Sequence, residues 1–361
     1  MKHKPIYYSE YLELNKILNA QNLKSTEHGK EAHDETLFII IHQTYELWFK
    51  QIIHELDSVY SLFNKPKVEP NSLGKIIQRL GRIIEIQKVL NEQISIIETM
   101  TPLDFMEFRD YLVPASGFQS IQFRTIELKL GLRQKYRLGI DQQFFNSRLK
   151  QEDKDFLQEL ENVPTLLELV DSWLTRMPFG KNSEYNFWKE YENATHKMLD
   201  SDQEIIEKNV TLSEKETQME LKNLKATRES FDNLFYEERF NKIKEENNIR
   251  LSRKALLSCI FIKLFKDEPI LQLPNKILEQ LVDIDEYFTT WRYRHAIMAH
   301  RLLGTKIGTG GSSGHDYLKR STENNRVFTD LFNLATFLLP KTYIPNLPSE
   351  LKDKLGFIHE K

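Results

Sequence analysis

The chain has 361 residues, 40% of them hydrophobic and 29% charged, and a formal net charge of -3; this is typical of a soluble globular protein and excludes a disordered chain or a basic nucleic-acid-binding surface. The single cysteine, Cys259, excludes an intrachain disulfide and a thiolate zinc site, and its apolar neighbours predict a buried thiol. Residues 1–14 lack the apolar stretch of a signal peptide, and no apolar run reaches the length of a membrane span, so we expect a cytoplasmic protein that binds neither membrane nor nucleic acid.

Most of the chain is predicted to be helical, because Gly and Pro are scarce and few segments alternate with a period of two. Apolar residues at helical spacing predict two long helices, over Leu37–Phe63 and Asn71–Ile97. We therefore predict an all-α fold, a helical bundle with an additional charged helical segment.

A third helix is predicted after residue 100. Thr101 suits the N-cap, Pro102 the first helical position and Asp104 the acid of a capping box. We expect this helix to end near Pro114 and another to begin close to Phe118.

The second half of the chain predicts a charged segment followed by core helices. Ser201–Arg250 is rich in Glu and Lys and predicts one or two solvated helices, arranged as a hairpin. Leu251–Phe265 is apolar enough to lie in the core, and Leu278–Leu303 predicts a helix that ends at Gly304. Phe328–Leu339 is predicted to be helical, and the three prolines that follow predict an extended tail.

Five of the 13 glycines fall in Gly304–Gly314. No Gly-Lys-Ser/Thr closes this loop, Ser313 stands where a dinucleotide fingerprint needs its third glycine, and the loop follows a predicted helix instead of a strand. A lid or a loop of backbone donors over a ligand therefore fits it better than a nucleotide site.

The histidines exclude some metal sites and leave others open. Neither Glu-x-x-His nor His-Glu-x-x-His occurs, which excludes the usual di-iron bundle and zincin patterns. His295 shares a helical face with Trp291 and Met298, whereas His300 faces elsewhere. From these residues alone, His295 is either a core histidine or the axial ligand of a haem.

Two more polar residues lie on aromatic helix faces. His42 follows Phe38 by four residues. It is either a core residue with a buried hydrogen bond, or a base or hydrogen-bond partner in a pocket. Arg109 follows Phe105 by four residues. It either forms an internal salt bridge or binds a planar anion.

Four stretches together resemble the tryptophan 2,3-dioxygenase family, in register from about residue 8 to residue 345. They are Leu37–Gln51, Thr101–Ser120, Trp291–His295 and Lys306–Gly314. The resemblance implies an all-α homotetramer, a dimer of dimers, with one haem b per subunit. It also implies insertion of both atoms of O2 across the indole C2–C3 bond of L-tryptophan, which gives N-formyl-L-kynurenine in the first step of the kynurenine pathway.

The resemblance also assigns roles to single residues. His295 matches the proximal iron ligand, and His42 matches the distal, catalytic histidine that meets the indole N–H. Arg109 matches the arginine that binds the substrate carboxylate, and Thr309 a loop threonine that contacts the amino-acid end. The remaining matches are the indole-flanking Phe38 and Phe105, the haem-edge residues Ser116 and Gly117, and the N-terminal residues Tyr8, Tyr11 and Leu12, which reach the neighbouring subunit's site. Trp291 is also expected to bind the cofactor.

We accordingly expect residues 1–30 to form this arm and residues 31–361 one domain, with a charged helical insertion at about 180–250. Two departures from the family are visible: the segment from Leu12 to His42 is longer than in some bacterial relatives, and His315 stands where many relatives have Tyr. The alternatives are a haem dioxygenase of broader indoleamine specificity, a haem or tryptophan sensor, and a scaffold without a cofactor. The presence of His42 argues against the dioxygenase of broader specificity. The presence of His42, Arg109 and Thr309 together argues against a sensor.

Overall fold

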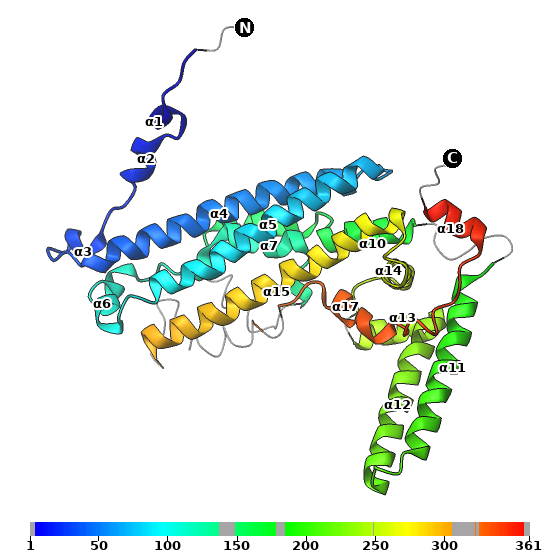
Figure 1. The fold of residues 1–361 in the computed structure, drawn as a ribbon. Coiled ribbons are helices and arrows are strands. Elements are labelled where there is room, and N and C mark those ends of the chain that lie inside the picture. The colour runs from blue at the N-terminus through cyan, green and yellow to red at the C-terminus, as the bar shows by residue number, and fades with distance from the viewer. Residues whose placement is uncertain are drawn as a thin grey trace. The chain divides into compact units, whose positions relative to one another are not determined.

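A computed structural model describes residues 4–136, 149–177, 185–247, 249–304, 322 and 325–356. Within these ranges the chain forms α-helices and short 3-10 helices without a β-strand, which confirms the predicted all-α fold (Figure 1). Nowhere in the same ranges is a helix both long and apolar enough to cross a membrane.

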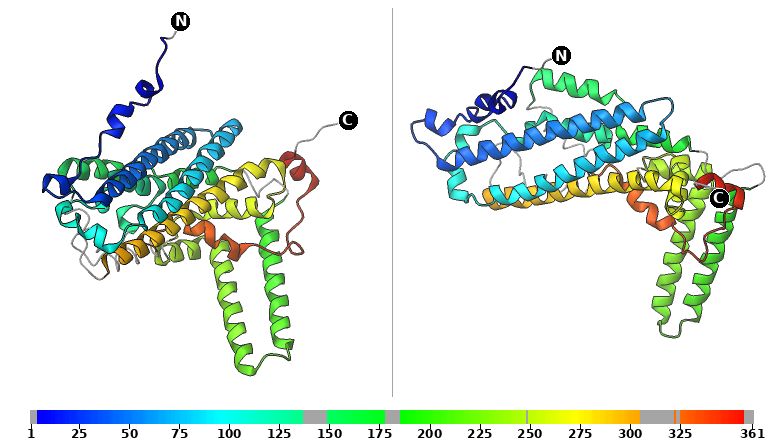
Figure 2. Two further views of the ribbon diagram at one scale, coloured as in Figure 1. Left: turned by 60° about the vertical axis from the view of Figure 1, so that its left-hand side comes forward. Right: turned by 45° about the horizontal axis from the view of Figure 1, so that its top comes forward.

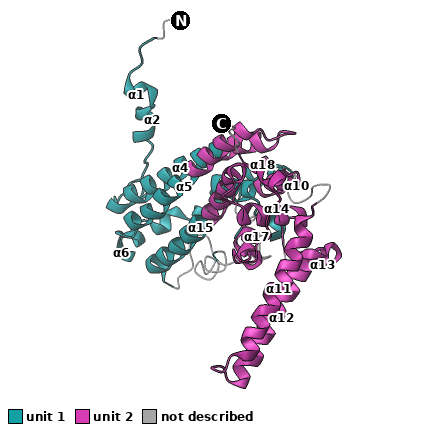
Figure 3. Cartoon of the chain, turned by 45° about the vertical axis from the view of Figure 1, so that its right-hand side comes forward, with its two compact units in different colours: residues 1–55, 83–163, 286–326 teal, residues 56–82, 164–285, 327–361 magenta. Residues whose placement is uncertain are grey.

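The chain divides into two compact units (Figure 3). Unit 1 contains residues 1–55, 83–163 and 286–326, and unit 2 contains residues 56–82, 164–285 and 327–361. The expectation of one domain over residues 31–361 stays a prediction.

Three long helices contribute residues to both units: α4 (His33–Phe63), α5 (Pro70–Ile97) and α15 (Pro269–Leu303). The periodicity placed α4 and α5 to within a few residues. α15 ends where predicted, because Gly304 adopts a φ of 59°, a conformation that favours glycine after a helix. It begins nine residues earlier than the predicted Leu278: Pro269 suits a first helical position, and Pro274 removes only one backbone hydrogen bond.

The other elements of unit 1 are short. They are α1 (Tyr8–Tyr11), α2 (Leu14–Leu18), α3 (Lys24–Glu27), α6 (Pro102–Met106), the 3-10 helices η1 (Arg109–Leu112), η2 (Gly117–Gln119) and η3 (Gln134–Tyr136), α7 (Ile121–Leu130) and α9 (Gln151–Glu161).

The capping box of α6 is confirmed, but the predicted end of this helix is wrong. The Thr101 hydroxyl accepts the Asp104 N–H at 3.3 Å, and the Asp104 carboxylate accepts the Thr101 N–H at 2.9 Å. α6 ends at Met106, well before Pro114, and the chain continues in the 3-10 helix η1. The physical reason is that Phe105 and Phe108 both turn into the core, which the tighter i→i+3 winding allows.

Unit 2 contains the charged segment and a second core. α11 (Phe187–Lys208) and α12 (Glu214–Phe235) pack side by side as a hairpin (Figure 2), followed by α13 (Glu237–Glu246). α10 (Leu166–Thr175) packs on α14 (Arg253–Leu264), which lies in the core as predicted. The thiol of Cys259 is fully buried there, and burial raises its pKa.

Two predictions for the C-terminal part are confirmed only in part. In place of one helix over Phe328–Leu339 the chain forms the short α17 (Thr329–Phe332) and the 3-10 helix η4 (Asn333–Phe337). The tail is not wholly extended, because it contains α18 (Ser349–Leu355). Pro348 occupies the N-cap of α18, a position where proline does not disturb a helix.

Candidate active site

An aromatic cluster in unit 1 brings together α4, α5, α6 and α15. Its buried members are Ala32, Ile41, Ile94, Ile97, Met100, Phe105, Phe108, Met298 and Leu302, and Phe38 and Trp291 pack against them. The rings of Phe38 and Phe105 lie 5.6 Å apart, and that of Phe108 stands edge-on to Phe105 at 5.4 Å. Two residues predicted to flank an indole are therefore neighbours, although 67 positions separate them in the sequence.

His42 lies one helical turn after Phe38, and its environment determines which nitrogen carries the proton. Its Nδ1 is 2.7 Å from the carbonyl oxygen of Phe38, and because a carbonyl only accepts, Nδ1 donates. The neutral ring then has an unprotonated Nε2 that can accept a hydrogen bond. Burial lowers the pKa of His42, against smaller raising effects of the Phe38 carbonyl and Glu46, so the neutral form is favoured.

His295 is also held neutral. Burial lowers the pKa of His295 to about 4. Its ring stacks on that of Trp291 at 5.1 Å with an angle of 4° between the planes. A neutral imidazole is the form that ligates a metal. Phe38 and Trp291, each four residues before one of the two histidines, pack on the same cluster, so His42 and His295 lie in one region of unit 1.

Trp291 is fixed by aromatic rings from two other helices. Phe123 of α7 lies 5.0 Å from it, and Tyr45 and Phe49 of α4 lie 6.0 and 6.4 Å away. The Tyr45 hydroxyl in turn donates to the Leu90 carbonyl oxygen at 2.9 Å, and burial raises the pKa of Tyr45 to about 12. Trp291, on which His295 stacks, is thus packed against three aromatic rings.

Arg109 is not on α6, as the sequence predicted, but opens η1. It is half-buried and directly follows Phe108, whose ring is 5.5 Å from Phe38. Leu112, at the other end of η1, packs on the aromatic cluster. The guanidinium is therefore carried by a short turn whose apolar residues pack in the same cluster as Phe38 and Phe105.

The comparisons with known proteins identify a family. A model of the family described as tryptophan 2,3-dioxygenase matches residues 2–338. A tryptophan 2,3-dioxygenase of Alteromonas mediterranea is 53% identical over 98% of both chains, and one of Bdellovibrio bacteriovorus is 50% identical over 99% of both. One of Dictyostelium discoideum is 48% identical over 98% of this chain and 89% of its own.

This chain belongs to the tryptophan 2,3-dioxygenase family. The family resemblance drawn from the sequence motifs is thereby confirmed. The roles of individual residues stay predictions, which the geometry supports to different degrees.

Two positions expected at the haem edge of a tryptophan 2,3-dioxygenase begin η2. The Ser116 hydroxyl accepts the Phe118 N–H at 3.4 Å, and the Ser116 N–H donates to Gln119 at 3.1 Å. A Cβ added to Gly117 would meet no protein heavy atom within 4 Å. Protein packing therefore does not require glycine here, and space is left beside this backbone.

Tyr8, Tyr11 and Leu12 do not join the cluster in their own chain. Tyr8 and Tyr11 are 74% and 71% exposed, and α1 buries none of its residues. Thr309 and His315 lie outside the described residues, as does the glycine loop after Gly304.

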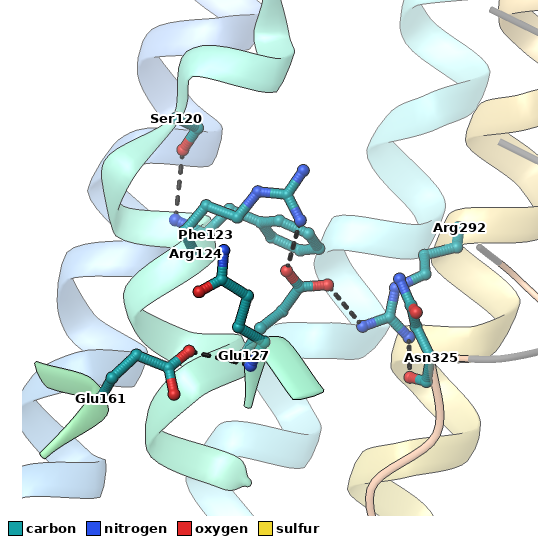
Figure 4. Close-up of polar contacts among 8 residues, drawn as sticks. Ser120, Phe123, Arg124, Glu127, Glu161, Arg292 and Asn325 are labelled. Atoms are coloured by element: carbon teal, nitrogen blue, oxygen red, sulfur yellow. Dashed lines mark hydrogen bonds and ion pairs between the residues drawn. The ribbon is translucent and has the colours of Figure 1, made fainter. Parts of the chain in front are cut away.

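The sequence interpretation missed a buried ionic network that joins α7 to α15, the helix of His295 (Figure 4). Glu127 of α7 accepts from Arg124 at 2.8 Å and from Arg292 of α15 at 2.9 Å. Arg292, adjacent to Trp291, also donates to the Asn325 carbonyl oxygen at 2.9 Å. The sequence shows charged residues within α7 and α15, but a charge pattern alone does not distinguish a buried ionic network from a solvated helix face.

Proposed function

We infer that this chain is a haem-dependent tryptophan 2,3-dioxygenase, which inserts both atoms of O2 across the indole C2–C3 bond of L-tryptophan to give N-formyl-L-kynurenine. This is the first step of tryptophan catabolism by the kynurenine pathway. One observation carries the substrate assignment: Phe38 and Phe105 are neighbours, and His42 beside them has its Nε2 free of a proton. Two neighbouring aromatic rings with one acceptor beside them suit an indole, whose ring N–H is its only strong donor.

The residues of unit 1 fit a haem b. His295 would hold the iron, because its neutral imidazole is ready to ligate, and Trp291, stacked on it, would fix the ring orientation. Ser116 and Gly117 would lie at the haem edge, where the space beside Gly117 supports the assignment. When bound, the haem supplies O2 binding and the redox chemistry, and the protein supplies orientation and electrostatics.

The substrate would be held at three points. Phe38 and Phe105 would enclose the indole, and His42 Nε2 would accept its N–H. Arg109 would bind the carboxylate, which suits the planar fork of a guanidinium in a half-buried position. Thr309 would contact the amino-acid end of the substrate.

We further propose a cytoplasmic homotetramer built as a dimer of dimers. The exposed rings of Tyr8 and Tyr11, together with Leu12, support this assembly, because large apolar side chains gathered on one projecting segment are typical of an interface. In the tetramer they would enter the neighbouring subunit's site.

The test is spectroscopic and enzymatic. Purified protein supplied with haem should show a Soret band, and after anaerobic reduction the addition of tryptophan and air should produce the absorbance of N-formylkynurenine. His295→Ala should lose tight haem binding. Absence of a Soret band would refute the haem assignment, and haem binding without product would leave a sensor as the better interpretation.

Specificity is a second test. A site built for carboxylate and ammonium leaves its own polar groups unpaired when they are missing, so L-tryptophan should be strongly preferred over indole. Comparable turnover of the two compounds would contradict the proposed substrate contacts.

A further inference from the structure

The short helix α3, which follows the N-terminal segment, is fixed firmly to α4. The Glu35 carboxylate, 1% exposed, accepts the backbone N–H groups of Lys24 at 2.8 Å and Ser25 at 2.9 Å. These two N–H groups have no partner inside a helix, so the buried carboxylate satisfies both of them. Ser25 in turn accepts the Ala32 N–H at 3.0 Å. α3 therefore has a defined position on the helix that carries Phe38 and His42.

The other end of α3 contacts η1. The imidazole of His28, the residue that ends α3, stacks on the ring of Tyr111 with 4.3 Å between centroids and 9° between planes. Lys30 lies 3.6 Å from Glu107 across the same boundary, in an exposed pair that contributes little. Gly29, with a φ of 83°, lets the chain turn between them.

η1 depends on such contacts for its geometry. It is a single 3-10 turn of four residues, which is too short to be stable by its own hydrogen bonds. Leu112 holds it from the side of the aromatic cluster, and Tyr111, 38% exposed, receives the His28 ring on the outside. The direction in which η1 presents Arg109 therefore depends on α3 as well as on the core.

We propose that α3 is a positioning element for recognition of the substrate carboxylate, with His28 holding Tyr111, and so η1, where Arg109 can bind that carboxylate. The inference rests on the proposed function, in which Arg109 binds the carboxylate of tryptophan. His28 itself does not contact the substrate. Because Glu35 precedes Phe38 by one helical turn, α4 sets both the indole slot and, through α3, the carboxylate partner.

The experiment measures dissociation constants of the holoprotein for two probes. Indole-3-propionate has the carboxylate, and 3-ethylindole lacks it. His28→Ala should weaken binding of indole-3-propionate about 2- to 10-fold, which is the range that loss of an aromatic pair allows, and should leave binding of 3-ethylindole unchanged. His28→Phe, which keeps a stacking ring, should restore the affinity.

Two controls make the result specific. His33→Ala removes another exposed histidine of the same region and should have no effect. In an Arg109→Met background, His28→Ala should cause no further loss, because it acts only through the guanidinium. Equal losses for both probes, or an undiminished loss in the Arg109→Met background, would overturn the proposal.

The outcome also separates this inference from the proposed function. If the wild-type holoprotein oxidises tryptophan but His28→Ala binds indole-3-propionate normally, the positioning role of α3 is wrong and the function stands. If the wild type forms no N-formylkynurenine, both fail.

Discussion

The ionic network of Glu127 allows the sharpest stability prediction, because its charges are almost completely removed from water. The side chains of Arg124, Glu127 and Arg292 are 8%, 2% and 7% exposed, and the two carboxylate–guanidinium contacts measure 2.8 and 2.9 Å. Glu127→Ala would remove the acceptor that both guanidinium groups share and leave their charges buried. Breaking a buried pair in this way costs about 3–5 kcal/mol of the free energy of unfolding, to be measured by urea denaturation followed by far-UV circular dichroism.

A surface pair provides the matched control. Glu85 and Lys88 have the same i,i+3 spacing as Arg124 and Glu127 and lie 2.7 Å apart, but they are 69% and 43% exposed. Glu85→Ala should therefore cost only about 0.5 kcal/mol. Replacing all three network residues by apolar ones of similar size should cost less than Glu127→Ala alone, since none of the three charges is then buried. Equal effects of Glu127→Ala and Glu85→Ala would refute the reasoning.

Two further predictions concern the haem side of the site. In the haem-free chain, burial lowers the pKa of His295 from 6.5 to about 4, so its contribution to the free energy of unfolding is complete above pH 6.5 and is lost as the pH falls toward 4. This contribution amounts to at most about 3 kcal/mol. His295→Gln should therefore make the urea midpoint less dependent on pH over this range. Gly117→Ala should leave the stability of the haem-free chain unchanged, because the added Cβ meets no protein atom within 4 Å, but should accelerate haem loss to apomyoglobin; unchanged haem retention would contradict the haem-edge assignment.

Features that depend on local sequence were predictable. The apolar periodicity of α4 and α5, the capping box at Thr101 and the glycine after α15 each involve residues within one or two turns. The stacking of Trp291 on His295 follows from their i,i+4 spacing on one helix face. Such features need no knowledge of the partner helices.

Features that depend on distant partners were not predictable from pattern. The chain forms η1 where the helix from Pro102 was predicted to continue, because Phe108 and Leu112 pack in a cluster with residues of α4, α5 and α15. Glu35 has the sequence context of an ordinary acidic residue at the start of a helix, yet its carboxylate caps a different helix. The approach of Phe38 to Phe105 could be anticipated only through the family resemblance, since no local rule relates the two positions.

The geometry of His42 leads to one prediction about its role that sequence could not supply. With Nδ1 bonded to the Phe38 carbonyl and the pKa lowered by burial, His42 is suited to accept the indole hydrogen bond but not to retain a proton. His42→Ala should therefore mainly reduce discrimination between L-tryptophan and 1-methyl-L-tryptophan, which lacks the N–H, by about 5- to 100-fold, the range for one buried hydrogen bond. Loss of a general base would instead lower kcat by about 100- to 10,000-fold. Steady-state kinetics with both substrates separates the two roles, and a fall in kcat of that size with unchanged discrimination would show that His42 removes the proton.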